Sequence, residues 1–121
     1  MRVAVDAQLN DLSPVAVEVL VVYDKKLLAT LETMSAQTWF AEREGLLQQY
    51  QQVEHALDAW LWEWVPGQVV PEQVRRFKAG ARGGLVFANY FSPGDHRASF
   101  DPFKPFLLNL QASGFTAERI D

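Results

Sequence analysis

The sequence predicts a mostly β fold: a two-sheet antiparallel β-sandwich with a short helical insertion after the second strand. Trp60, Trp62 and Trp64 recur at every second position, and side chains that alternate in this way share one face of a strand. Roughly six to eight short strand-like segments are separated by turn signals, which is typical of a sandwich. Helical spacing of apolar residues is confined to residues 24–50. We expect a single domain over residues 1–121, because a chain of this length can build one core.

Two strands open the chain. Residues 2–9 alternate apolar and polar side chains and predict a strand. Residues 10–14 predict a turn in which Pro14 sets the direction of the chain as it enters the next strand. Residues 15–23 predict the next strand, with valine at four successive alternate positions. Because both faces of this strand are nearly all apolar, we expect it to lie at the centre of its sheet or to be partly covered.

The helical insertion follows directly. Asp24 is a good N-cap for a helix over residues 25–34, and Ser35 can cap a second helix over residues 36–50. The second helix carries an apolar stripe, and Gly45 weakens it in the middle. We expect the two helices to pack over one end or one face of the sandwich.

The second half of the chain predicts the remaining strands. The tryptophan strand covers residues 57–65 and ends at a Pro-Gly turn. Residues 69–77 are ambiguous, because Pro71 fits either an edge strand or a loop. The other expected strands cover residues 85–91, 96–100, 106–110 and 115–120, with a turn at residues 92–95.

The composition excludes several classes of site. A net charge of −4 does not favour a general nucleic-acid-binding surface. The absence of cysteine excludes disulfides and cysteine-ligated metal sites. The apolar runs are strand-sized, so we expect no membrane-spanning helix. His55 and His96 are far apart and are expected to be surface or turn residues, so we expect neither a metal nor a cofactor.

No catalytic arrangement stands out, and we expect that the protein is not an enzyme. Asp58 and Glu63 are separated by an odd number of positions, which puts them on opposite faces of their strand and excludes a carboxylate pair. Residues 80–84 are rich in glycine but precede a strand, whereas a phosphate loop follows a strand. We expect a turn with a close backbone approach there, and a small hydrolase is disfavoured.

Two surface features leave alternatives open. The tryptophan face fits either a buried core or a platform for sugar rings, so a carbohydrate-binding module is the alternative function. A basic cluster fits either a solvated face or a partner-docking surface, and it comprises Arg75, Arg76, Lys78 and Arg82.

The order of the elements resembles the outer-membrane lipoproteins of type VI secretion systems, the TssJ family. The resemblance covers roughly residues 3–91 and depends on the order of the motifs, since each one is common by itself. In that family a turn with Asn and Ser-Pro precedes a valine-rich strand ending in Tyr, a helical insert follows, and a later strand ends in Pro-Gly. The matching residues here are Asn10, Ser13-Pro14-Val15, Tyr23, Trp64-Val65-Pro66-Gly67 and Gly83-Gly84 with Tyr90-Phe91.

The resemblance implies a non-enzymatic assembly component of a bacterial envelope secretion apparatus. It would lie in the periplasm at the outer membrane, attached only through a lipid anchor outside this sequence, and would dock the periplasmic domain of a TssM-like inner-membrane component. The family's docking loop is shortened here to residues 10–14, so we expect that loop and the first helix to act together, with the turn at residues 92–95 as a further candidate. The alternative is that these residues have only a structural role and close the core. The expected partner-binding residues are Asn10, Asp11, Leu12, Ser13, Lys25, Lys26 and Leu28.

Overall fold

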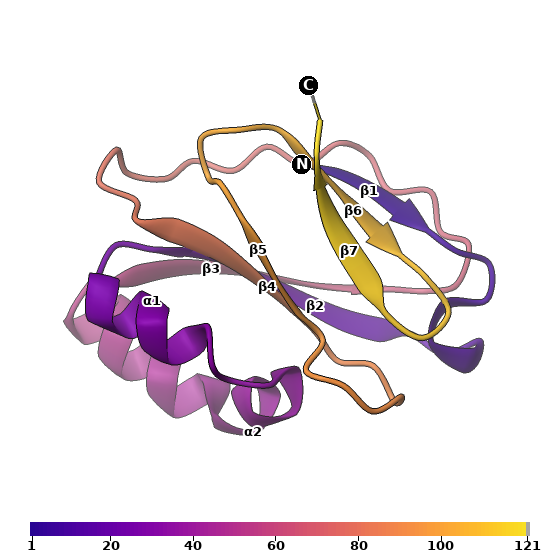
Figure 1. Cartoon of the computed structure of the whole chain (residues 1–121), viewed down its shortest axis with the longest axis horizontal. Helices are drawn as coiled ribbons and strands as arrows, with labels where there is room; N and C mark the ends of the chain where they lie inside the picture. Colours follow the sequence, from indigo (N-terminus) through magenta and orange to yellow (C-terminus); the bar gives the residue numbers. More distant parts are fainter. Residues whose placement is uncertain (121) are drawn as a thin grey trace.

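Two facing β-sheets and a helical layer make up the structure, a computed structural model that describes residues 1–120. Within that range, seven strands divide into a four-stranded large sheet and a three-stranded small sheet. The small sheet covers one face of the large sheet, and the helices cover the other face (Figure 1). The predicted mostly β sandwich with a helical insertion after the second strand is therefore confirmed.

The large sheet is built around its second strand. Its order is β3 (Leu57–Trp64), β2 (Val15–Val22), β4 (Gly83–Ala88) and β5 (Arg97–Phe100), and every neighbouring pair is antiparallel. Strand β2 lies between β3 and β4 and is buried on both faces along most of its length. This confirms the central position that its apolar sequence predicted.

The small sheet has the order β1 (Arg2–Val5), β6 (Phe106–Leu110) and β7 (Phe115–Arg119). Strands β6 and β7 form the expected antiparallel hairpin, but β1 runs parallel to β6. No hairpin joins β1 to β6, because most of the chain lies between them, so nothing local imposes an antiparallel direction.

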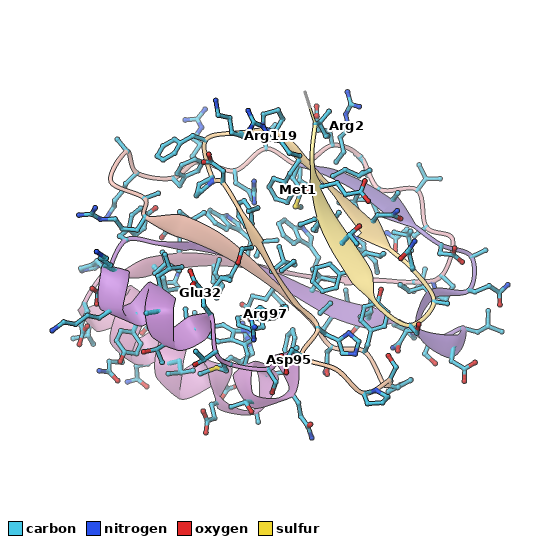
Figure 2. The ribbon with its side chains drawn as sticks, in the orientation of Figure 1. Met1, Arg2, Glu32, Asp95, Arg97 and Arg119 are labelled. Atoms are coloured by element: carbon cyan, nitrogen blue, oxygen red, sulfur yellow. The ribbon has the colours of Figure 1, made fainter. Side chains whose placement is uncertain are left out.

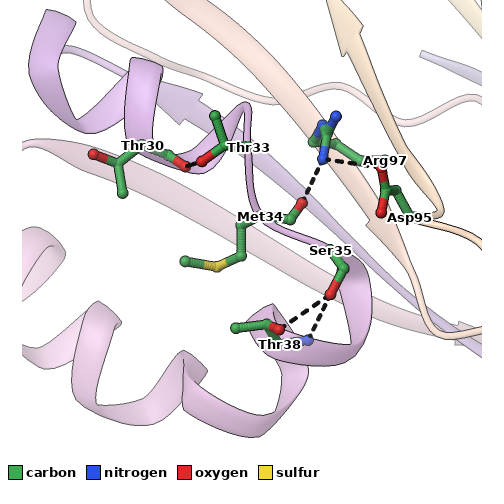
Figure 3. A network of polar contacts seen from close by, with 7 residues as sticks. All are labelled: Thr30, Thr33, Met34, Ser35, Thr38, Asp95 and Arg97. Carbon is green, nitrogen blue, oxygen red and sulfur yellow. Dashed lines mark hydrogen bonds and ion pairs between the residues drawn. The ribbon is translucent and has the colours of Figure 1, made fainter.

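Both helices begin where the sequence predicted and end earlier. The Asp24 side chain caps α1 (Lys25–Leu31) by accepting from the Lys26 amide, and Ser35 Oγ caps α2 (Ala36–Leu47) by accepting from the Thr38 amide (Figure 3). Helix α1 ends where the Thr33 and Met34 amides bond to the carbonyls three residues earlier, as in a tighter 3-10 turn. A wider π-helical turn, Gln48–Val53, extends α2.

Two apolar cores lie on either side of the large sheet. Val86, Ala88 and Trp64 point into the core between the sheets, whereas Leu85 and Phe87 point into the core beneath the helices. The tryptophans share the inner face, as predicted: Trp64 is buried, and Trp60 and Trp62 are half-buried against the same core. They therefore line the sandwich interior and do not form an exposed platform.

A buried carboxylate joins the helical layer to the large sheet. Glu18, in the centre of β2, is 1% exposed. Arg43 donates two hydrogen bonds to its two carboxylate oxygens, each 2.7 Å long, and the Trp39 indole donates a third at 2.7 Å. This charged hydrogen bond raises the pKa of Arg43. Both donors come from α2, so the pairing fixes where that helix lies on the sheet.

Residues 65–82 form an extended strap without strand pairing, which settles the ambiguity at residues 69–77 in favour of a loop. Arg75 points inward from this strap, and its guanidinium lies 5.3–5.6 Å from the ring centroids of Trp60, Phe100 and Phe106. Burial lowers the pKa of Arg75. The basic cluster expected from the sequence is therefore divided, because Arg75 belongs to the interior while Arg76, Lys78 and Arg82 are exposed.

Gly83 and Gly84 begin β4 and do not belong to the turn expected over residues 80–84, but the close approach expected there is present. A Cβ on Gly84 would overlap the Phe100 ring, so glycine at this position lets that ring lie flat against the sheet beside Phe106.

The first prediction concerns the tryptophan strand. Trp64→Ala should lower the free energy of unfolding by about 3–5 kcal/mol, because it opens a cavity between the sheets. Trp62→Ala should cost clearly less, since that side chain is half-exposed and stacks on Trp64 with ring centroids 5.5 Å apart. Urea unfolding of both variants measures the difference; equal losses would contradict the assignment of Trp64 to the core.

The second prediction concerns the buried carboxylate. Arg43→Met should lower the free energy of unfolding by about 3–5 kcal/mol, because it leaves the Glu18 charge buried without its cation. Adding Glu18→Gln to that variant should recover part of the loss, since a neutral amide oxygen can still accept from Trp39. Chemical unfolding of the single and double variants provides the test. A double variant with a lower free energy of unfolding than Arg43→Met would refute the account.

Candidate functional site

A left-handed turn between β1 and β2 is the most strained backbone in the described chain. Asn10, Asp11 and Leu12 follow one another with φ of 46°, 54° and 62°. A left-handed conformation costs a residue other than glycine about 1–2 kcal/mol, and it is seldom repeated at successive positions. Strain of this kind persists where surrounding contacts impose it, and it is concentrated at functional sites.

Asn10 supplies the contacts that impose the turn. Its side chain is 2% exposed; Nδ2 donates to the Pro14 carbonyl at 3.0 Å, and Oδ1 accepts from the Phe91 amide at 2.9 Å. The second bond ties the turn to the segment after β4. Asn10 therefore positions this surface from beneath and offers little to a partner directly.

Exposed apolar side chains lie on both segments that Asn10 joins. Leu12 is 66% exposed and Phe91 is 75% exposed, although both are large hydrophobic residues. The sequence placed Phe91 on a strand over residues 85–91, but β4 ends at Ala88. The Asn89 amide makes the last ladder bond, to the Ala16 carbonyl, and the Tyr90 amide then bonds back to the Ala88 carbonyl, so the chain turns away from the sheet. The early end of β4 exposes Phe91, and neighbouring turn residues were the sole sequence signal for it.

The turn after Phe91 is held from three directions. Buried Tyr90 donates to the Gln111 carbonyl at 2.9 Å and stacks on His96, and Ser92 Oγ donates to the Ser113 carbonyl at 2.7 Å. The Ala36 amide, at the start of α2, donates to the Asp95 carbonyl at 2.7 Å. We call the surface formed by residues 9–13, 91–96 and 111–114 the loop end.

The loop end contains a groove of about 410 Å³ beside the start of α2. Gly94, with φ of 137°, allows the turn that forms one wall. Figure 3 shows how the other wall is fixed: Arg97 donates to the Met34 carbonyl at 2.6 Å and lies 3.9 Å from Asp95. The groove is lined by Ala36, Gln37, Ala88, Asn89, Tyr90, Phe91, Ser92, Pro93, Gly94 and His96.

The predicted partner-binding residues do not form one surface. Asn10, Asp11, Leu12 and Ser13 precede β2, whereas Lys25, Lys26 and Leu28 follow it. Eight residues of extended strand separate the two groups, which corresponds to roughly 25 Å. The turn at residues 92–95, the further candidate named from the sequence, is the segment that adjoins the Asn10 loop.

The helical half of the expected surface contributes mainly to packing. Leu27 is buried, and Leu28 is half-buried with its methyl groups against Gly83. Lys25 and Lys26 are exposed at the start of α1. The unequal burial of the two leucines agrees with their helical spacing, and Leu28 closes the core on this side.

The loop end has no catalytic geometry among the described residues. Ser92 Oγ lies 3.3 Å from His96 Nε2, but Nε2 is also 2.7 Å from the Ser92 carbonyl oxygen. A carbonyl oxygen only accepts hydrogen bonds, so Nε2 is the donor in this contact and is not free to act as a base toward the Ser92 hydroxyl. Ser92 Oγ is itself turned to the Ser113 carbonyl, so this pair is arranged as a turn contact and not as a base with its nucleophile. Residues 1–120 contain no cluster of three or more potential metal ligands and no helix suited to crossing a membrane.

Comparison with known proteins supports the predicted resemblance at the level of the fold. Neither a protein-family model nor a curated protein sequence matches this chain. Among solved structures, it is similar to Serratia marcescens Lip, which is described as a membrane-bound component of the type VI secretion system. The TM-score is 0.63 at 16% identity, and the match covers 98% of this chain and 94% of that chain. At this low identity, the structural match shows that the two chains share a fold over nearly their whole length.

The third prediction uses Tyr90, the buried support of the loop end. Burial raises the pKa of Tyr90 to about 12, above the value of 10.0 for a free tyrosine. The neutral side chain therefore contributes stability that is complete below about pH 10 and is lost as the pH rises through 12. Tyr90→Phe should cost about 1 kcal/mol at pH 8, through loss of the bond to Gln111, and should flatten the alkaline decline.

Urea unfolding of wild type and Tyr90→Phe across the alkaline range measures both effects. Parallel stability curves above pH 10 would show that Tyr90 does not titrate as its burial requires.

Proposed function

We propose that this protein is a non-enzymatic assembly component of a bacterial envelope secretion apparatus, and that its loop end docks a partner protein. The partner is the periplasmic domain of an inner-membrane secretion component, similar to TssM. The protein lies on the periplasmic side of the outer membrane, held there by a lipid anchor. The fold shared with a membrane-bound type VI secretion component supports the class of protein.

The pair of exposed side chains at the loop end is the observation that carries the proposal. Leu12 and Phe91 come from segments far apart in the sequence, and the buried Asn10 side chain joins those segments. Large apolar groups fixed in this way supply the anchors that dominate protein interfaces. A strained turn that displays one of them is more easily explained by binding than by stability, since the strain lowers stability.

The groove beside Phe91 provides the complementary half of such an interface. A volume of about 410 Å³ can receive a side chain of the partner, and Tyr90 and His96 offer aromatic walls. The Leu12 and Phe91 side chains would enter pockets of the partner, and the groove would receive a side chain from the partner. This reciprocal arrangement compensates for the short first loop, because the interface then extends over residues 91–96 as well.

The alternative functions have weaker support. A carbohydrate-binding module needs an exposed aromatic platform, but the tryptophans face the interior. The surface of α1 offers Lys25 and Lys26 without an apolar anchor, since Leu27 is buried. A hydrolase needs a base aimed at a nucleophile, which the Ser92 and His96 contacts do not provide.

The fourth prediction tests the loop end with matched changes. Leu12→Asn removes the apolar side chain and introduces a residue type that tolerates a left-handed backbone. It should weaken binding of the periplasmic domain by a factor of ten or more, as should Phe91→Asn, because anchor residues typically contribute 2 kcal/mol or more.

Leu61→Asn makes the same change at an exposed leucine on β3, away from the loop end, and should leave affinity unchanged. Surface plasmon resonance with the purified domain measures all three variants, and melting curves confirm folding. Full binding by both loop-end variants, or equal losses in all three, would refute the proposed docking surface.

A further inference from the structure

The end of the sandwich opposite the loop end is a second continuous surface. Strand β6 begins at this end and finishes at the loop end, and the N-terminus lies here (Figure 1). Met1 and Gln73 exchange two hydrogen bonds of 3.0 and 2.9 Å, the Phe77 ring lies 5.5 Å from the Phe103 ring, and the Ile120 amide bonds to Pro105. We call this surface, formed by residues 1–2, 72–77, 101–105 and 119–120, the basic end.

Positive side chains gather at the basic end although the protein as a whole is acidic. Arg2 on β1 and Arg119 on β7 lie on either side of the start of β6 (Figure 2), and Lys104 lines a pocket of about 180 Å³ together with Arg119. Arg76 projects from the outward side of the strap, between two residues that point inward. Among the described residues of the basic end, the acidic side chains are Glu72, which pairs with Arg2 at 3.8 Å, and Asp101, which accepts from the Phe103 amide. Because the net charge is −4 overall, the residues outside the basic end are negative in sum.

Apolar groups stand among these cations. Val74 is 88% exposed and Phe103 is 56% exposed, and the Phe77 contact holds the segment that carries Phe103 near the strap. Beneath them, Arg75 is held by aromatic rings, so the strap is fixed to the sandwich and presents its outer residues in a stable arrangement. Cations interspersed with exposed apolar side chains are the combination that binds the interfacial region of an anionic bilayer.

We propose that the basic end docks directly on the headgroups of anionic phospholipids at a membrane surface, with Phe103 and Val74 entering the interfacial layer. The partner-facing loop end then points away from the bilayer. The lipid anchor proposed above would hold this same face against the membrane if it is attached at the amino-terminal end. The inference itself depends on the charge and the apolar groups, and it is tested without an anchor or a protein partner.

A bilayer fits this surface better than a soluble polyanion does. A nucleic acid would bind a small positive patch on a protein that is acidic overall. A flat bilayer touches one end of the molecule and leaves the acidic sides in water. Exposed Val74 and Phe103 also favour an interface with an apolar layer below its charges.

Vesicle flotation with the purified chain tests the proposal. Vesicles of phosphatidylethanolamine with phosphatidylglycerol should bind the protein at low salt, and vesicles of phosphatidylcholine alone should not. Each basic residue near an anionic surface contributes about a fivefold factor, so Arg76→Gln with Lys104→Gln should lower partitioning about 25-fold. Phe103→Ser should lower it further without changing the salt dependence, because it removes no charge.

The control makes the same change of net charge elsewhere. Lys25→Gln with Lys26→Gln, at the exposed start of α1, should leave partitioning within about twofold, because those side chains lie outside the basic end. Equal losses in the two double variants would overturn the proposal, as would wild-type binding that is absent or indifferent to lipid charge. Tighter binding to single-stranded DNA than to anionic vesicles would overturn it in favour of a soluble polyanion.

Discussion

The buried carboxylate of Glu18 is the constraint on which the rest of the arrangement depends. An ionised group at the centre of a sheet is costly unless it is paired, and both of its donors come from α2. The start of that helix then holds the Asp95 carbonyl through the Ala36 amide, and Arg97 reaches back to Met34. One charged pairing in the middle of β2 thus fixes the helical layer, and through it the turn that borders the groove at the loop end.

The two proposed docking surfaces lie at the ends of the sandwich, since its faces are covered. The small sheet covers one face of the large sheet and the helices cover the other, so the apolar strand surfaces are occupied. The two ends differ in chemistry: Leu12 and Phe91 make one apolar and concave, whereas Arg76 and Lys104 make the other basic. A protein built in this way can contact two different surfaces at once, as a bridging component of an assembly requires.

The sequence predicted those features that follow from local patterns. Alternating tryptophans identified the inner face of β3, and valine on both faces of β2 identified the central strand. The loop end depends on long-range contacts that leave no local pattern. The bond between Asn10 and Phe91 joins positions 81 residues apart, and the bond from Tyr90 to the Gln111 carbonyl joins positions 21 residues apart. The capping residue correctly predicted the start of α1. Eight residues of strand, however, separate this helix from the loop with which it was expected to form one docking surface.

Hydrogen–deuterium exchange of the chain with and without the periplasmic partner domain tests the central claim most directly, because it maps the interface on the backbone without any substitution. The account predicts slower exchange in residues 9–13 and 91–96, with α1 and α2 unchanged. The Ser13 amide is already bonded to the Leu9 and Asn10 carbonyls, so it should exchange slowly without the partner as well, which shows that the turn is formed before binding. Protection confined to the helices or to the outer edge of β3, with the loop end unaffected, would contradict the account.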